Sequence, residues 1–127
     1  MLILFDIDGT LVDAGGAGLT ALQDAAIEVF GEAGPPLDLA GGTDGAILRG
    51  FFEYFGRKYD PVVGEEFYQS YLSRLKENLR NPSYGGRLLE GVKTLLASLR
   101  REGHCLGLLT GNIERGAMVK VSHYGIA

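Results

Sequence analysis

Two aspartates, Asp6 and Asp8, stand two residues apart near the start of the chain, directly after an apolar run at residues 2–5 (LILF). The run predicts a buried strand that ends at Asp6, and Gly9-Thr10 supplies the turn that follows it. A buried carboxylate is costly without a partner, and two carboxylates this close repel each other. Folding alone would not explain such a pair. A bound divalent cation and a role in catalysis would explain it.

A second apolar run, residues 105–109, ends in a small hydroxyl residue, Thr110, followed by Gly111 and Asn112. Taken alone, a Thr-Gly-Asn turn is often purely structural. In an open parallel sheet, however, ligands bind beyond the carboxyl ends of the strands. Both motifs stand at such ends, so we expect them to contribute to one site.

Helical patterns fill the space between and around these motifs. Steps of three and four residues between apolar positions predict helices over residues 18–31, from Thr43 or Asp44 to about 55, and over about 65–79. A strongly amphipathic helix is predicted over residues 88–101, with basic residues in its last turn. A last helix is predicted from near residue 113 to residues 124–125.

This order of elements predicts an α/β protein. A helix that leads into a second unbroken apolar strand is typical of a Rossmann-like parallel sheet, which this chain would contain only in part. We expect residues 1–13 and 86–127 to form the partial α/β core. Residues 14–85 would form an all-helical cap inserted into that core.

The amino-acid composition restricts the binding partners and the cellular compartment that we expect. The 127 residues are 46% hydrophobic and carry a formal charge of −4, which argues against nucleic-acid and anionic-membrane partners. The single cysteine, Cys105, is predicted to be a small buried hydrophobe in a reducing compartment. No stretch approaches the roughly 20 apolar residues of a membrane span. We therefore expect a cytoplasmic protein.

The Asp-Ile-Asp-Gly-Thr-Leu run and the later Leu-Leu-Thr-Gly-Asn run resemble the first two signature motifs of the haloacid dehalogenase-like hydrolases. A helical insertion between the motifs is similar to the phosphoglycolate phosphatase-like branch of that superfamily. The segment Leu89-Glu90-Gly91-Val92 resembles the one that precedes the second motif there. The resemblance covers nearly the whole chain.

The resemblance implies a Mg²⁺-dependent phosphomonoester hydrolase that acts on a small phosphorylated metabolite. Asp6 would be the nucleophile that forms an aspartyl-phosphate, and Asp8 would protonate the leaving alcohol and later activate water. Mg²⁺ would bind the Asp6 carboxylate and the Asp8 backbone carbonyl. The phosphoryl oxygens would be held by Thr110, Gly111, Asn112 and backbone N–H groups around Gly9.

The turn at residues 41–45 (GGTDG) has two interpretations. It is either an ordinary loop with a helix N-cap, or a cap segment that faces the active site. In the second case Thr43 and Asp44 would take part in substrate selection, and helix N-terminal N–H groups could bind an anionic group of the substrate.

The family pattern continues with a lysine and an acidic motif that completes the Mg²⁺ site. Two basic residues after Thr110 are candidates for that role, Arg115 and Lys120, although the resemblance places both on a helix that usually carries surface charges. We therefore expect the chain to be the N-terminal portion of a longer polypeptide. The alternatives are strands supplied by another chain and a degenerate product. An unpaired edge on the first strand would invite self-association.

Two other functions remain open at this point. A sugar phosphomutase of the same superfamily uses the same two aspartates. A truncated fragment could retain only phosphate or partner binding without catalysis.

Overall fold

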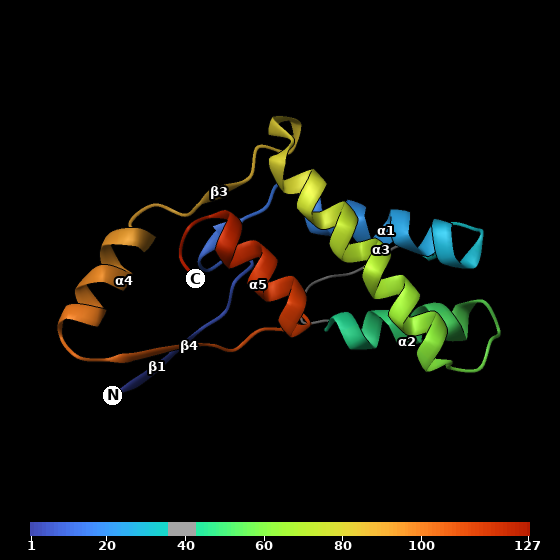
Figure 1. Cartoon of the computed structure of the whole chain (residues 1–127), viewed down its shortest axis with the longest axis horizontal. Helices are drawn as coiled ribbons and strands as arrows, with labels where there is room; N and C mark the ends of the chain where they lie inside the picture. The colour runs from blue at the N-terminus through green and yellow to red at the C-terminus, as the bar shows by residue number, and fades with distance from the viewer. Residues whose placement is uncertain (36–42) are drawn as a thin grey trace.

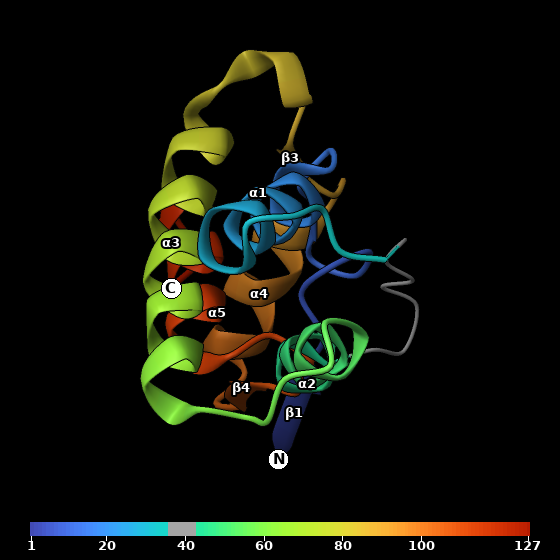
Figure 2. The ribbon, with the colours of Figure 1, turned by 90° about the vertical axis from the view of Figure 1, so that its right-hand side faces the viewer.

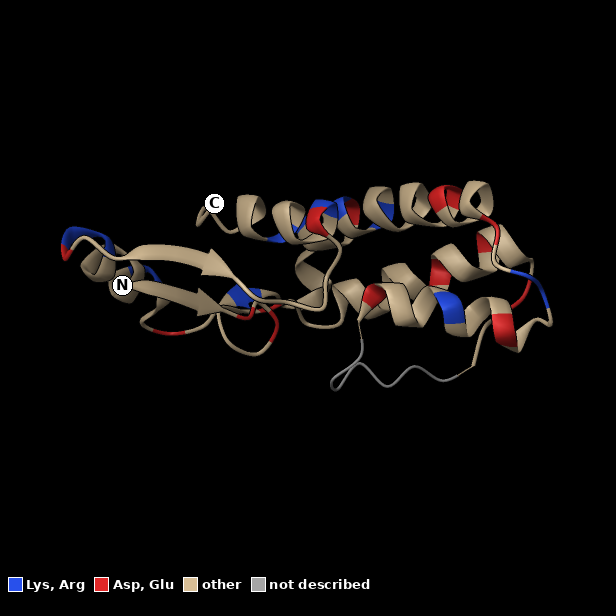
Figure 3. Ribbon diagram, turned by 90° about the horizontal axis from the view of Figure 1, so that it is seen from below, with Lys and Arg blue, Asp and Glu red and all other residues tan. Residues whose placement is uncertain are grey.

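Two parallel strands form the sheet that carries both motifs. In the computed structural model, which describes residues 1–35 and 43–127, β1 (Leu2–Phe5) pairs with β4 (Cys105–Leu108) so that Leu2 lies opposite Cys105. Figure 3 shows the two strands side by side and pointing the same way. The predicted α/β class with a parallel sheet is confirmed. Because the strands are parallel and in this register, Asp6 and Leu109 leave the sheet at the same edge.

The two strands are less buried than their sequence predicts. Leu2 is 63% exposed and Leu4 is 50% exposed, and Cys105 is exposed as well. The predicted burial of the first strand and of Cys105 is therefore wrong for this chain. The reason is that the described sheet has only these two strands, so neither is flanked on both sides.

A three-helix unit makes up the larger core. It consists of α1 (Ala17–Phe30), α2 (Asp44–Tyr54) and α3 (Pro61–Arg80), and it is followed by a short 3-10 turn, η1 (Pro82–Tyr84). Figures 1 and 2 both place α3 alongside α1 and alongside α5 (Glu114–His123). The three largest fully buried side chains of this core are aromatic, namely Tyr71, Phe51 and Phe67. The predicted helical insertion is present in this part of the chain.

Local signals explain where these helices begin and end. The Thr43 hydroxyl accepts the Ala46 N–H at 3.1 Å and caps α2, as predicted for this position. Gly31, in the left-handed region, ends α1. α3 begins at Pro61, four residues before the predicted start, because Asp60 caps it and proline suits a first helical position. Gly41 and Gly42 of the predicted cap turn lie outside the described residues.

The chain crosses between the α/β part and the helical unit twice, at neighbouring places. β2 (Val12–Asp13) and β3 (Arg87–Leu88) pair antiparallel, with Val12 opposite Leu88. The helix predicted to start at residue 88 begins instead at Val92 as α4 (Val92–Arg101), after a left-handed Gly91. These crossings coincide with the predicted boundaries near residues 13 and 86, although the division into two domains stays a prediction.

A second, smaller core fixes the loop after β1. Ile7, Leu11 and Val12 are buried against Val92 of α4 and against Ala117 and Val121 of α5. The loop also has its own hydrogen bonds, in which the Ile7 carbonyl accepts the N–H groups of Thr10, Leu11 and Val12. The loop that carries both aspartates is thus held rigidly beside α5.

None of the described helices is long and apolar enough to cross a membrane. β1 has β4 as its one strand partner within the described parts of the chain. Self-association through its free edge stays a prediction.

The crossing between the two parts gives a test of the fold. Gly15 and Gly16 both have positive φ angles, but a Cβ on Gly15 would lie 1.7 Å from the Tyr84 carbonyl oxygen, whereas a Cβ on Gly16 would meet nothing. We expect Gly16→Ala to lower the free energy of unfolding by about 1 kcal/mol and Gly15→Ala by at least about 3 kcal/mol. Urea unfolding followed by circular dichroism measures both, and equal losses would contradict the packing described here.

Candidate active site

Asp6 and Asp8 lie on one side of the loop and Ile7 on the other. Ile7 is fully buried in the smaller core, while both aspartates are exposed and line the same cavity. The premise that the two carboxylates are buried is therefore wrong, because the alternation that buries Ile7 turns its neighbours outward. One Asp6 carboxylate oxygen, Oδ1, accepts the Ile7 N–H at 2.8 Å. Within residues 1–35 and 43–127, this is the one side-chain hydrogen bond of Asp6.

Lys120 provides the positive charge beside these carboxylates. Its Nζ donates to both Asp8 carboxylate oxygens, at 2.9 and 3.0 Å, and to Asn112 Oδ1 at 2.8 Å. Lys120 is 4% exposed, whereas the Asp8 side chain is half exposed. The expectation that Lys120 lies on a helix surface is wrong.

The sequence holds a signal for the buried position of Lys120. Within α5, Lys120 follows the buried residues Gly116 and Ala117 by four and three residues, which is the spacing of one helix face. A lysine on the apolar face of a helix is almost never fully buried unless it is paired. Such a lysine indicates a carboxylate nearby in the fold.

The second motif joins the same network. The Asn112 side-chain amide donates to Asp8 Oδ2 at 3.0 Å and to the Thr110 hydroxyl oxygen at 2.7 Å. The Asn112 backbone N–H also donates to that hydroxyl oxygen, at 3.2 Å. Because Thr110 accepts twice, its own O–H remains free to donate to a ligand. The two motifs therefore lie together in one site, as predicted.

The glycines of the two motifs differ in what they can offer. The Gly9 N–H donates to the Val12 carbonyl at 2.9 Å, so Gly9 serves mainly to allow a left-handed turn. The Gly111 carbonyl accepts the Asp44 N–H at 2.8 Å, which ties this loop to the start of α2. The phosphate-binding roles of Gly9 and Gly111 stay predictions.

A cavity of about 680 Å³ brings these groups together between the α/β part and the helical unit. Both motifs line it, together with Lys120 and residues of the β2–α1 connection. Residues of α1, α2 and α3 line it as well. Thr43 and Asp44 are among them, so the structure places this predicted pair at the cavity.

Asp44 links α2 to the second motif. Its carboxylate is buried and accepts the Ile113 N–H at 3.1 Å. Burial raises its pKa, the nearby Asp8 charge adds to that effect, and the Ile113 hydrogen bond and Lys120 oppose it. The sequence analysis suggested that N–H groups at this helix end could bind an anion. The Asp44 N–H cannot do so, because it donates to the Gly111 carbonyl.

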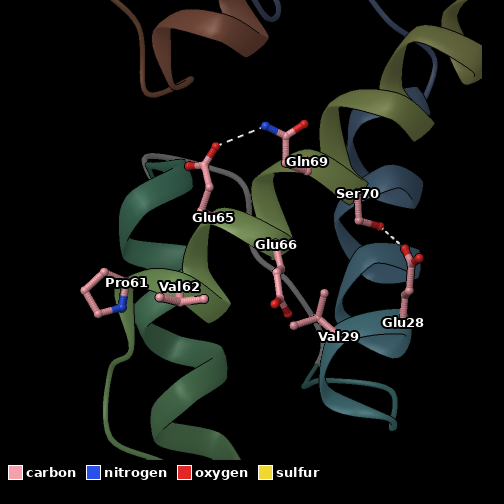
Figure 4. Close-up of a pocket in the computed structure, with 8 residues that line it drawn as sticks. All are labelled: Glu28, Val29, Pro61, Val62, Glu65, Glu66, Gln69 and Ser70. Atoms are coloured by element: carbon pink, nitrogen blue, oxygen red, sulfur yellow. Dashed lines mark hydrogen bonds between the residues drawn. The ribbon is translucent and has the colours of Figure 1, made fainter.

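A second cavity, of about 830 Å³, lies on the helical unit and contains none of the motif residues. Figure 4 shows two of its three acidic side chains already paired, Glu65 with Gln69 and Glu28 with Ser70. Arg74 and Arg115 bind the same two glutamates from outside the cavity. We therefore assign the candidate site to the cavity of the two motifs.

The site offers oxygen ligands for a hard divalent cation. The Asp6 carboxylate and the Asp8 backbone belong to one rigid loop, and oxygen is the donor type that Mg²⁺ prefers. Among the described residues, no three acidic, histidine or cysteine side chains are arranged so that they alone could hold a metal ion. The residues fit a partial Mg²⁺ site in their chemistry.

Comparison with known proteins assigns the family. The sequence pattern of the haloacid dehalogenase-like hydrolases matches residues 3–127, so the chain belongs to that family. A comparison with curated proteins found no match.

Solved structures share the fold at low sequence identity. They include a predicted phosphoglycolate phosphatase from Haemophilus somnus 129PT (TM-score 0.66, 21% identity, 98% of this chain and 57% of that one). A predicted phosphatase from Clostridium acetobutylicum is similar (TM-score 0.61, 21% identity, 98% and 56%). So is a candidate beta-phosphoglucomutase from Thermotoga maritima (TM-score 0.57, 19% identity, 98% and 56%). The chain thus spans little more than half the length of these structures.

The raised pKa of Asp44 gives a prediction for stability. A carboxyl whose pKa is higher when folded stabilises the protein fully below its unfolded pKa, and this contribution is lost as the pH rises through the folded pKa. Asp44→Asn keeps an oxygen for the Ile113 N–H but cannot ionise. We therefore expect the variant to gain stability relative to the wild type as the pH rises above the ordinary carboxyl range.

Urea unfolding at a series of pH values from 3 upward measures this difference. Asp60→Asn is the matched control, since the Asp60 carboxylate also accepts a backbone N–H at the start of a helix but is exposed. A constant difference between wild type and Asp44→Asn at all pH values would contradict the burial of the Asp44 charge.

Proposed function

We propose that this chain carries the nucleophile and phosphate-binding part of a Mg²⁺-dependent phosphomonoester hydrolase. The observation that supports it most is the network of Asp8, Lys120, Asn112 and Thr110, which lines the same cavity as the Asp6 carboxylate. These groups would supply a nucleophile, a proton carrier, a cation and a hydroxyl donor within one cavity. Phosphoryl transfer needs this combination.

Asp6 is the nucleophile in this proposal. Its Oδ1 is held by the Ile7 N–H, and its other oxygen attacks phosphorus while the ester P–O bond breaks. The leaving oxygen takes a proton from Asp8, and an aspartyl-phosphate remains on Asp6. Asp8 then removes a proton from water, which attacks phosphorus and restores the Asp6 carboxylate.

Lys120 has a role in both states of the site. Without phosphate its ammonium neutralises Asp8, at 2.9 Å. A phosphate dianion that enters the cavity competes for the same ammonium. Asp8, released from the ion pair, takes up a proton from solvent and in this protonated form meets the leaving oxygen. The Thr110 hydroxyl, which already accepts two N–H groups, donates to a phosphoryl oxygen.

Mg²⁺, when bound by the Asp6 carboxylate and the Asp8 backbone carbonyl, would offset the repulsion between carboxylate and phosphate. The negative charge of the chain and its single cysteine support a cytoplasmic enzyme with a small phosphorylated substrate and no nucleic-acid partner.

The nucleophile can be tested by a single substitution. We expect Asp6→Asn to lower the rate of p-nitrophenyl phosphate hydrolysis in Mg²⁺ by at least about 10³-fold, because the amide cannot attack phosphorus. Asp24→Asn is the control, since Asp24 is on α1 and lies outside the cavity. Phosphate release measures the rate. Activity retained in Asp6→Asn would contradict the proposal, and a folded wild-type chain without turnover would contradict independent catalysis.

The role of Lys120 is tested by Lys120→Met. We expect KM for p-nitrophenyl phosphate to rise about 10- to 100-fold, because the phosphate loses a charge-assisted hydrogen bond. Lys76→Met, the same change at an exposed position of α3, should leave KM unchanged. Steady-state kinetics on variants with native circular dichroism measures both, and equal KM values would remove Lys120 from the site.

A sugar phosphomutase is the second candidate, and one similar fold bears that description. With a hexose phosphate as the probe, transfer of phosphate between two hydroxyls without net release would favour the mutase. Net release of inorganic phosphate would favour the hydrolase.

A further inference from the structure

The charge of the cavity restricts the substrate. Four carboxylates line it, from Asp6, Asp8, Asp13 and Asp44, and within the described part of the chain Lys120 is the one cation of the lining. Residues 36–42, which the structure does not describe, contain Asp38 but no lysine or arginine. The cavity is therefore acidic on the side of the helical unit as well as at the motifs.

Lys120 cannot serve a second anionic group. Its ammonium already makes three contacts of 2.8 to 3.0 Å with Asp8 and Asn112, and in the proposed function it meets the phosphate. A substrate with a carboxylate in addition to its phosphate would place that carboxylate near Asp13 or Asp44 without a cation. Like charges brought together in a partly desolvated site are strongly unfavourable.

Tyr71 of α3 offers a neutral polar contact on the same side. It is 1% exposed and is among the residues that line the cavity. The phenol packs against α5 where Gly116 leaves room, since a Cβ there would lie 3.4 Å from the Tyr71 hydroxyl oxygen. A tyrosine hydroxyl can both donate and accept a hydrogen bond, so at the cavity wall it is suited to meet a hydroxyl group of a ligand.

The electrostatic surroundings of Tyr71 agree with that position. Burial raises its pKa, and the Asp44 and Asp8 charges add to the shift. Its phenol thus stays protonated as a donor in the field of the site's acids. Leu19, Leu22 and Ile47 complete this side of the cavity with apolar surface.

We propose that the substrate is a phosphate monoester whose organic part is uncharged and carries a hydroxyl group, bound by Tyr71 and Asp44, and not a phosphorylated carboxylic acid. This inference rests on the proposed function and adds the substrate class. It differs from the description of the Haemophilus somnus structure as a phosphoglycolate phosphatase, which at 21% identity shares the fold with this chain.

Two ligands of matched size test whether the organic part of the substrate must be uncharged. sn-Glycerol 3-phosphate and 3-phosphoglycerate have the same carbon skeleton, and a hydroxymethyl group in one replaces a carboxylate in the other. We expect the full chain with Mg²⁺ to bind the glycerol phosphate at least about tenfold more tightly in isothermal titration calorimetry. The ratio of kcat/KM values should favour it by a similar factor. Equal binding, tighter binding of 3-phosphoglycerate, or no binding of the glycerol phosphate would overturn the proposal.

Tyr71→Phe tests the hydroxyl contact. We expect it to lower the preference for glycerol phosphate over propyl phosphate, which lacks both hydroxyls, by about tenfold. Tyr54→Phe removes the same group from an exposed cap residue outside the cavity and should leave the preference unchanged. An unchanged preference in a natively folded Tyr71→Phe would remove Tyr71 from the substrate contact.

The two proposals fail in different ways. If p-nitrophenyl phosphate is hydrolysed but 3-phosphoglycerate binds better than glycerol phosphate, the substrate class is wrong and the hydrolase stands. If no ester is hydrolysed, the hydrolase is wrong, and the calorimetric comparison still decides which ligand the cavity prefers.

Discussion

The parallel pairing of β1 with β4 is the constraint on which the site depends. Because the two strands run in the same direction and in register, the loops that follow them leave the sheet at one edge. Asp8 and Asn112, 104 residues apart in the chain, thereby come within hydrogen-bond distance. The crossover between the strands is long enough to contain the whole helical unit. The cavity floor is made by the sheet edge and its roof by the inserted helices.

Charge compensation at this edge comes from α5. The Asp8 carboxylate and the Lys120 ammonium form an ion pair that Asn112 extends to Thr110, so four side chains from three segments hold one another. Such a network is satisfied without a ligand, yet its members can exchange partners when an anion enters. Asp44 connects the same loop to α2, so the helical unit is tied to the chemistry through a buried carboxylate and a backbone hydrogen bond.

Much of the fold could be predicted from local patterns. The parallel α/β class, the capping role of Thr43 and the end of α1 at Gly31 are confirmed, because each depends on a few neighbouring residues. The early start of α3 had a signal in Asp60-Pro61 that apolar periodicity alone does not contain. The short strands β2 and β3 had none, because each exists only through pairing with a segment about 75 residues away.

The sequence by itself determined the family, the two aspartates and the Thr-Gly-Asn turn, because these are short runs whose chemistry is written in adjacent residues. Tertiary structure decided that Asp6 and Asp8 face an open cavity, that Lys120 is the cation beside them, and that Asp44 and Tyr71 come from the cap. The physical reason is that burial and charge pairing depend on segments that meet only in the folded chain. Lys120, predicted to lie on the surface, is buried in the site because its ion pair with Asp8 offsets the cost of burying its charge.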